Sequence, residues 1–241
     1  IAVGWVREVY IDPPHFTFNF IGFDFLQPLP GYGMYIWFGL LGLLAICITL
    51  GYRYRLSIVL FKIGWFGVYL MHKTSYNNHH YLMALLASIM CIVPAHKAYS
   101  LDVKQLRVAP SSSLPRAYWL LFVGLFFIVF TYASIAKIYP DWIKGIPLSQ
   151  WLEAKKDSSF AFLYAGKQPL IMAWGGIFFD LLIIPAFLWK RTRNLAFFAS
   201  LYFHLMNSIT FQIGTFPYMM IGAAVLFYPA EKLRKWFKMN K

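Results

Sequence analysis

Long apolar runs alternate with short polar segments along the whole chain. Seven of these runs have nearly the length that a helix needs to cross a bilayer, which is about 20 residues. They predict helices at 34–50, 56–71, 79–94, 117–137, 169–189, 195–209 and 216–229. We therefore predict an all-α integral membrane protein, a polytopic bundle of about seven transmembrane helices. Because the sequence opens at Ile1 without a methionine, we also expect one more helix N-terminal to it.

The composition agrees with a membrane protein, since 60% of the residues are hydrophobic and only 13% are charged. The formal net charge of +13 would also suit a nucleic-acid-binding protein, but the basic residues are sorted by loop. They gather in every second loop between the predicted helices and in the C-terminal segment, which all lie on the same side of the membrane. These residues are Arg53, Arg55, Lys97, Lys104, Arg107, Arg116, Lys190, Arg191, Arg193, Lys232, Arg234, Lys235, Lys238 and Lys241. By the positive-inside rule these loops are cytoplasmic, so the expected partner is membrane lipid and not nucleic acid.

The opposite loops, at 1–33, 72–78, 138–168 and 210–215, then face the periplasm of a bacterial inner membrane or the lumen of the endoplasmic reticulum. We predict three regions. Residues 1–33 form an outer interfacial loop, rich in proline and phenylalanine, for which a ligand lid is the sharper alternative. Residues 34–229 form the transmembrane bundle with a site at its outer side, and residues 230–241 form a basic cytoplasmic tail. Within the outer loops, residues 147–167 suit an interfacial amphipathic segment.

The most polar stretch beside an apolar run is 73–82, which contains Tyr76, Asn77, Asn78, His79 and His80. A bilayer offers no hydrogen-bond partners to amides and imidazoles, so such a cluster at a helix mouth caps the helix or handles a ligand. One asparagine as N-cap is the simpler explanation, but it accounts for one residue of the cluster only. We therefore predict the centre of a site here.

Three further polar positions interrupt apolar runs. Lys137 lies shortly before Pro140, which should stop the predicted helix near Tyr139. A cation in the last turn of a helix offsets the helix dipole. That role is the simpler alternative to catalysis. Asp180 lies in the middle of 169–189, and we expect a structural ion pair before chemistry. For Lys62 we expect snorkelling to the inner interface, and the alternatives are pairing with an acid such as Asp180 and a part in chemistry.

His204 and Asn207 are three residues apart, hence on one helix face near its outer end, where an interhelical hydrogen bond is the plain alternative to a site. Gly214 and Pro217 should end this helix and begin the next. The topology brings the cluster at 77–80, Lys137 and this pair to the same side of the membrane. We predict no metal site, because the histidine spacings of membrane metalloenzymes are absent. A lysine at an apolar mouth can serve as general base towards a weak acid dissolved in the bilayer.

Three motifs resemble the vitamin K-dependent gamma-glutamyl carboxylase family and its wider set of carboxylase-like, horizontally transferred transmembrane domains. They are Lys73-Thr74-Ser75-Tyr76-Asn77-Asn78-His79-His80-Tyr81-Leu82, the stretch from Ala133 to Trp142 that contains Lys137-x-x-x-Asp141-Trp142, and Phe203-His204-x-Met206-Asn207-Ser208-x-x-Phe211-x-Ile213-Gly214-x-Phe216. The motifs are ordered and span about 140 residues. The resemblance continues more weakly from the Pro28-Leu29-Pro30 region to the C-terminus.

The resemblance implies a lyase that oxygenates reduced vitamin K (phylloquinone or menaquinone hydroquinone) to the epoxide with O2. This reaction would drive carboxylation of peptidyl glutamate by CO2, with a glutamate-containing peptide as partner. Lys137 matches the family's hydroquinone base, and His79 matches its histidine tied to carboxylation. The resemblance and the shared side of the membrane assign the quinone pocket to Asn78, Tyr76, Asn77, His204, Asn207 and Phe211.

The sequence departs from the family in several places. Ser134 replaces a usual glycine, and His72 replaces an aspartate that commonly precedes the lysine at 73. The vertebrate enzymes carry a large lumenal region after the membrane part, whereas this sequence stops at Lys241. The alternatives are therefore a quinol epoxidase without carboxylation and a non-enzymatic membrane module that binds a quinone or lipid. A transporter is disfavoured because the chain shows no internal repeat.

Overall fold

The computed structural model describes residues 2–12, 18–153, 166–211 and 213–236. These residues form helices, turns and irregular segments, and no strand occurs among them. The chain divides into two compact units, Ile1–Tyr118 and Trp119–Asn240, with the boundary near the start of one long helix.

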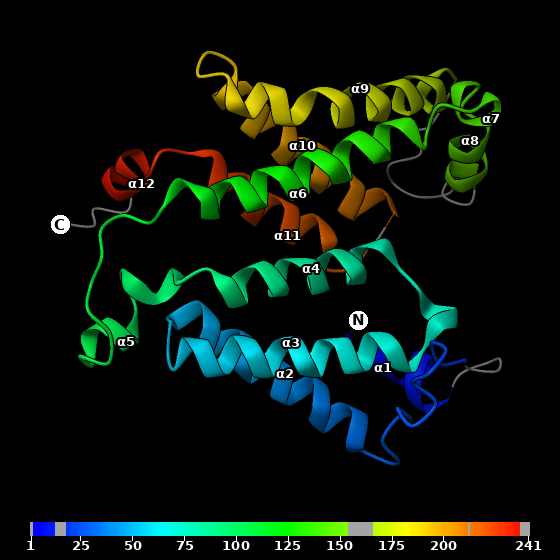
Figure 1. Ribbon diagram of the computed structural model, residues 1–241. Coiled ribbons are helices and arrows are strands. Elements are labelled where there is room, and N and C mark those ends of the chain that lie inside the picture. The colour runs from blue at the N-terminus through cyan, green and yellow to red at the C-terminus, as the bar shows by residue number, and fades with distance from the viewer. Residues whose placement is uncertain (1, 13–17, 154–165, 212, 237–241) are drawn as a thin grey trace. The chain divides into compact units, whose positions relative to one another are not determined.

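The first unit consists of three long helices, of which α3 packs against both α2 and α4 (Figure 1). The long helices are joined and flanked by short helical turns. In chain order the elements are α1 (Ala2–Val6), the π-helical turn η1 (Arg7–Ile11), α2 (Gly33–Leu50), α3 (Tyr54–Met71), the 3₁₀ turn η2 (Lys73–Ser75), α4 (Asn78–Ile92), the 3₁₀ turn η3 (Ala95–Lys97) and α5 (Leu101–Lys104).

The segment predicted as an outer loop is partly helical and packs on the first unit. Val6 and Tyr10 are buried in one cluster with residues of α2 and α3, namely Met34, Leu41, Val68 and Met71. The Tyr10 hydroxyl also donates a hydrogen bond to the Val68 carbonyl, at 3.4 Å. The alternation of aromatic residues beside prolines did not reveal these turns, because five-residue helices are too short to show a period. Residues 13–17 of this segment lie outside the described residues.

The turn between α2 and α3 is closed by a carboxylate from a distant segment. Gly51 ends α2 in the left-handed region (φ 62°), where a Cβ would overlap the Cβ of Ser100. Asp102 then accepts hydrogen bonds from the backbone N–H groups of Arg53 (2.8 Å) and Tyr54 (2.9 Å). Those N–H groups stand at the start of α3, where a helix has no acceptors of its own. Asp102 is therefore the N-terminal cap of α3, although it lies 48 residues further along the chain.

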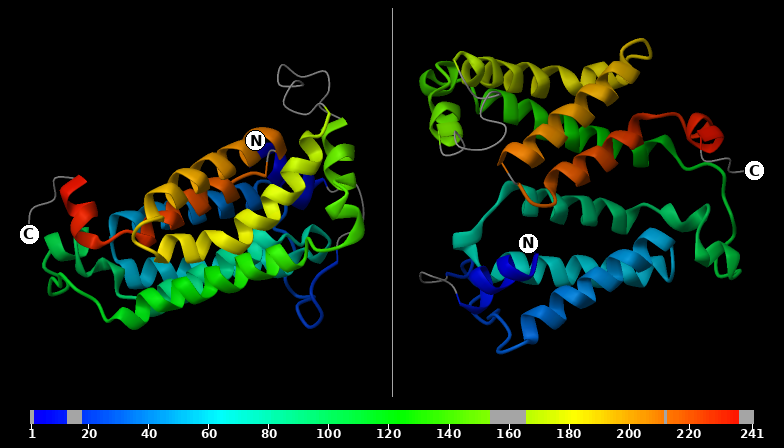
Figure 2. Two further views of the ribbon diagram at one scale, coloured as in Figure 1. Left: turned by 90° about the horizontal axis from the view of Figure 1, so that it is seen from above. Right: turned by 180° about the vertical axis from the view of Figure 1, so that it is seen from behind.

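The second unit contains the remaining long helices, and α10 packs against both α9 and α11 (Figure 2). Short helices α7 and α8 contact one another and α9. In chain order the elements are α6 (Arg116–Ile135), α7 (Pro140–Ile143), α8 (Ile146–Glu153), α9 (Gln168–Leu188), α10 (Arg193–Phe211), α11 (Phe216–Ala224), the 3₁₀ turn η5 (Val225–Phe227) and α12 (Ala230–Trp236).

Helices occur in all seven predicted ranges, but two boundaries are wrong. The last range, 216–229, is α-helical only to Ala224 and continues as the 3₁₀ turn Val225–Phe227. The helix expected to stop near Tyr139 ends at Ile135, because the N–H groups of Lys137 and Ile138 bond to carbonyls only three residues back. Pro140 does not end that helix. It begins α7, where its missing N–H is tolerated. By contrast, α10 ends before Gly214 (φ 60°) and Pro217 lies in the first turn of α11, as predicted.

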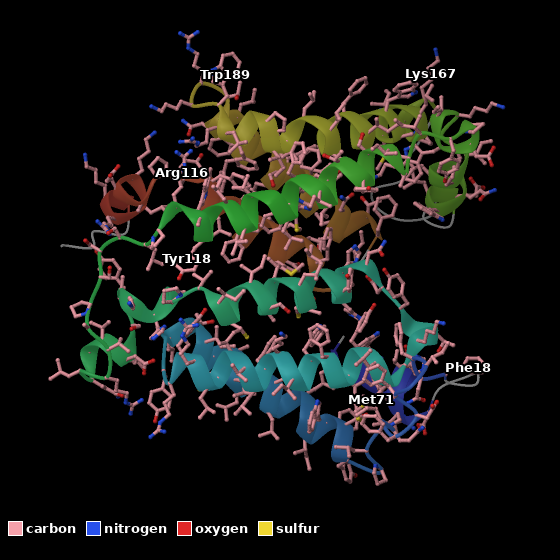
Figure 3. All side chains as sticks on the ribbon, viewed as in Figure 1. Phe18, Met71, Arg116, Tyr118, Lys167 and Trp189 are labelled. Carbon is pink, nitrogen blue, oxygen red and sulfur yellow. The ribbon has the colours of Figure 1, made fainter. Side chains whose placement is uncertain are left out.

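Four of the helices, α2, α3, α6 and α9, are long and apolar enough to cross a membrane, which fits an integral membrane protein. Figure 3 shows Lys167 and Trp189 at the two ends of α9, the positions where such residues anchor a span at the membrane surface. The helices α4 and Phe216–Phe227 are apolar but shorter. Seven spans therefore remain a prediction. The amphipathic segment predicted at 147–167 includes α8, while residues 154–165 lie outside the described residues, as do 237–241 of the predicted tail.

Asp102→Ala should destabilise the first unit by about 1–3 kcal/mol, because it leaves two backbone donors of α3 without an acceptor. Asp102→Asn keeps an oxygen acceptor and should lose less. Thermal unfolding in detergent measures both. Asp24→Ala is the control, since the Asp24 side chain is exposed; an equal loss in that variant would contradict the capping role.

The contribution of Asp102 should also depend on pH. Burial raises the pKa of its carboxyl, but the backbone N–H groups of Tyr54 and Arg53 outweigh burial and leave the pKa below its usual value of 3.8. A carboxyl with a lowered folded-state pKa contributes stability above the unfolded value and loses it as the pH falls through the folded value. We expect the difference in unfolding temperature between the native chain and Asp102→Ala to be constant near neutral pH and to shrink below about pH 4. A difference that shrank already between pH 7 and pH 5 would be inconsistent with this account.

Candidate functional site

Lys137 lies in the turn between α6 and α7 and is paired with Asp180 of α9. Its Nζ is 2.5 Å from Asp180 Oδ2 and donates a second hydrogen bond to the Ala133 carbonyl, at 3.0 Å. The Asp180 side chain is only 6% exposed, and that of Lys137 is 23% exposed. Asp180 therefore has the structural ion pair that we expect from the sequence. Its partner is Lys137, 43 residues earlier in the chain. The other lysine considered, Lys62, has its Nζ over the Phe66 ring.

The ion pair is surrounded by contacts that bring α6, α7 and α9 together. Lys137 Nζ lies 5.6 Å from the centre of the Trp142 ring, a distance at which cation and ring attract. The Trp142 indole N–H donates to the Ala173 carbonyl of α9, at 3.1 Å. A Cβ at Gly176 would lie 3.9 Å from the Lys137 side chain, an ordinary van der Waals distance, so the lysine stem packs beside this glycine of α9.

Ser134 adds a direct link between α6 and α9 beside the pair. Its hydroxyl donates to the Ile177 carbonyl at 3.1 Å, and the residue is 2% exposed. Serine stands here where the resembling family usually has glycine. A hydrogen bond of this kind holds two apolar helices in register, which a glycine cannot do.

Aromatic rings connect Lys137 to the predicted pocket residues of α10. The Trp142 ring meets Trp151 of α8 edge to face at 6.1 Å, and Trp151 meets Phe211 in the same way at 5.9 Å. The second unit thus places Lys137 and Phe211 at the two ends of one row of rings. Trp142 belongs to the motif that contains Lys137, whereas nothing in the sequence pattern marked Trp151 as part of it.

His204 is a deeply buried polar residue of α10, at 1% exposure. Phe179, Phe203 and Phe216 surround its ring, with centroids 5.4–5.8 Å away. Neither Nδ1 nor Nε2 has a hydrogen-bond partner among the described residues. Buried polar atoms without partners are rare and call for an explanation. Asn207 lies three residues later on the same helix and is half-buried.

The cluster at 76–80 of the first unit divides into different roles. Asn77 is the N-cap of α4, since its Oδ1 accepts the backbone N–H of His79 at 2.8 Å. The hydroxyl of Tyr76 donates to Asn78 Oδ1, also at 2.8 Å, and both residues are exposed. His79 is half-buried. His80 packs edge to face against Trp5 and Trp65, which explains it as a packing residue.

The predicted site residues fall into two groups. The first unit holds Tyr76, Asn77, Asn78 and His79, while the second unit holds Lys137, His204, Asn207 and Phe211. Their convergence on one site joins both units and stays a prediction. Among the described residues no group of three or more His, Cys, Asp or Glu side chains could hold a metal ion. Sequence reasoning treated Asp180 as structural only, and it missed Trp151 and Phe179.

Replacing Lys137 should destabilise the protein more than replacing Asp180. Lys137→Met leaves the buried Asp180 carboxylate without a partner, for which we expect a loss of about 3–5 kcal/mol. Asp180→Leu leaves a lysine that can still reach water, so its loss of unfolding free energy should be smaller. The double variant should recover part of the stability that Lys137→Met loses. Unfolding in detergent, read as a double-mutant cycle with Lys144→Met as exposed control, measures the coupling. Additive losses would show that the pair does not stabilise the unit.

Comparison with known proteins agrees with the helical membrane architecture. The family model of the HTTM domain matches residues 1–232. This domain is the one found in vitamin K-dependent carboxylase and related proteins. No solved structure matches the chain. Since the match covers nearly the whole sequence, the chain belongs to the HTTM domain family.

Proposed function

We propose that this protein is a membrane enzyme that oxygenates reduced vitamin K to its epoxide and couples that reaction to carboxylation of peptidyl glutamate. The observation that supports it most is the Lys137 amine, held by a buried carboxylate beside a tryptophan ring at the end of a membrane helix. Membership of the HTTM domain family agrees with this chemistry.

The proposed reaction balances without a metal. Hydroquinone and O2 give the epoxide and water. O2 takes up four electrons, two from oxidation of the hydroquinone to the quinone and two from the ring double bond that becomes the epoxide. In the coupled half, the γ-carbon of a glutamate gives a proton to the strong base that forms on oxygenation and makes a bond to CO2, which gives γ-carboxyglutamate. The protein must therefore accept a proton from a phenolic hydroxyl, and it must keep water from the reacting groups.

The geometry around Lys137 suits a base that returns to the same place after each proton transfer. In the ion pair Lys137 is an ammonium, so it must first give up one proton, for which Asp180 Oδ2 lies 2.5 Å away. The neutral amine then has two N–H donors and one lone pair. Asp180 and the Ala133 carbonyl can accept from the two donors, which leaves the lone pair to accept the hydroquinone proton. After transfer the ammonium has one further N–H, and the nearby face of Trp142 can stabilise its charge. Asp180 is thus a positioning residue for Lys137.

We propose residues of α10 for the ring of the quinol. The His204 imidazole is buried among phenylalanine rings and its nitrogens have no partner among the described residues. A hydroxyl or carbonyl on a flat aromatic ligand would supply that partner, and rings such as Phe179 and Phe216 would stack or pack against the ligand. His204, Asn207 and Phe211 are accordingly proposed as pocket wall.

The first unit would supply the remaining roles that the resemblance implies. Asn78 uses its oxygen to accept from Tyr76, so its NH2 group is the part of the side chain that we propose as a donor to the quinone. Asn77 uses its oxygen in the helix cap, so any contact with the quinone would come from its NH2 as well. His79 is proposed for the carboxylation half. Epoxidation without carboxylation is the nearest alternative. A module that binds a quinone without turnover is the other, and it is favoured by the fact that the Lys137–Asp180 pair also satisfies a structural role.

Lys137→Ala should reduce epoxide formation by about 10²–10⁴-fold, the usual contribution of a positioned general base. The assay is purified protein with vitamin K hydroquinone and O2, with epoxide measured by chromatography. Lys144→Ala is the matched control, because Lys144 is exposed at the end of the neighbouring helix α7 and should keep full activity. Undiminished epoxide from Lys137→Ala would exclude the proposed base. Tight quinone binding without any epoxide from the native chain would favour the binding module.

His79→Ala should separate the two halves of the reaction. With a glutamate-containing peptide and labelled CO2, we expect carboxylation to fall by about 10²-fold or more while epoxide formation falls much less. His80→Ala is the comparison, since loss of its contacts with Trp5 and Trp65 should lower stability but leave the ratio of carboxylation to epoxidation unchanged. If both products fell equally in His79→Ala, the assignment to carboxylation would be wrong. No carboxylation by an epoxide-forming native chain would identify an epoxidase alone.

A further inference from the structure

A second polar site lies in the first unit, remote in sequence from every residue assigned to the proposed reaction. A pocket of about 250 Å³ opens where α3 begins and the 95–108 segment crosses it. It is lined by Arg53, Arg55, Leu56, His96, Asp102, Arg107 and Val108. Three arginines face one carboxylate here, so the lining carries a clear excess of positive charge.

The single carboxylate is occupied by the fold. Asp102 accepts the backbone N–H groups of Arg53 and Tyr54, and it receives only a long contact from Arg107, at 3.5 Å. Arg55 directs part of its guanidinium to the carbonyls of Cys91 and Ile92 at the end of α4. Arg107 also lies over the Tyr52 ring, 4.9 Å from its centre. Since each guanidinium has five N–H donors, these contacts still leave donors of the three arginines for another acceptor.

His96 is the second observation that points to a ligand. The residue is 5% exposed, and its ring stacks on Tyr54 with centroids 4.9 Å apart. Its Nδ1 is buried and has no hydrogen-bond partner among the described residues. Burial, together with the charge of Arg55, lowers the pKa of His96, so at neutral pH the ring is uncharged and offers one N–H donor.

The chemistry of this lining selects the ligand. Clustered arginines and a neutral imidazole donor suit a group with several acceptor oxygens and negative charge, and phosphate fits the planar guanidinium best. The pocket also stands at the end of α3, a helix long and apolar enough to cross a membrane, and it includes Leu56, which is 53% exposed. A basic pocket at the end of a membrane helix, with an apolar side, is where a phospholipid head group lies.

We propose that this pocket binds a phosphate group, supplied by the head group of an anionic phospholipid. The site is independent of the proposed quinone chemistry, because it shares no residue with it. Free phosphate has the same oxygen chemistry, so the experiment must separate the two sources.

The test compares lipids bound to the full chain, purified in detergent, by native mass spectrometry. The native chain should retain phosphatidylglycerol in preference to phosphatidylcholine. Arg53→Gln with Arg107→Gln should weaken phosphatidylglycerol binding by roughly 30-fold, the effect of removing two basic groups at about 1 kcal/mol each. Lys190→Gln with Arg191→Gln removes the same charge from exposed positions of the second unit and should leave binding unchanged.

Each outcome decides the proposal. Equal retention of the two lipids by the native chain would overturn it without any variant, so a variant that folds poorly cannot hide the answer. Equal loss in both double variants would also overturn it, since only bulk charge would then matter. Inorganic phosphate added at millimolar concentration should compete weakly. Soluble glycerophosphate is the reference competitor. Suppose that inorganic phosphate displaced phosphatidylglycerol as effectively as glycerophosphate does, and that the double arginine variant no longer bound inorganic phosphate. The pocket would then be a soluble-phosphate site, and the lipid assignment would be wrong.

Discussion

The ion pair between Lys137 and Asp180 is the constraint on which the second unit depends. A carboxylate in the middle of an apolar helix is expensive unless a cation and hydrogen bonds accompany it. The chain meets this demand by ending α6 early, at Ile135, so that Lys137 lies in a turn from which it reaches α9. The hydrogen bond from Ser134 to the Ile177 carbonyl then follows from the same close approach of the two helices.

The first unit solves a related problem at its helix ends. Open N–H and C=O groups at the ends of membrane helices need partners, and the chain supplies them from other segments. Asp102 closes the start of α3, and Arg55 closes the end of α4. Asn77 caps the start of α4 from the adjacent position. Polar side chains that looked like candidates for chemistry are thus partly accounted for by backbone geometry, which leaves Asn78 and His79 as the more specific members of their cluster.

The long helices were predictable because apolar runs of bilayer length are an unambiguous signal. The short helices were not, since α1, η1 and α7 are too brief to show a period and are held by tertiary contacts. Asp180 was recognised as needing a partner, but a pair separated by 43 residues cannot be assigned from sequence when both Lys62 and Lys137 are available. The contact between Trp151 and Phe211 was not predicted for the same reason, because only the fold brings α8 against Phe211.

The position of the boundary between the units has a consequence for how the protein is made. One cut in the chain, between Tyr118 and Trp119, separates two sets of internally packed helices, so neither unit borrows a helix from the other along the sequence. Residues synthesised first contain all the partners of α2, α3 and α4 that close their ends. The first unit can therefore form its internal contacts while most of α6 and all later helices are still on the ribosome.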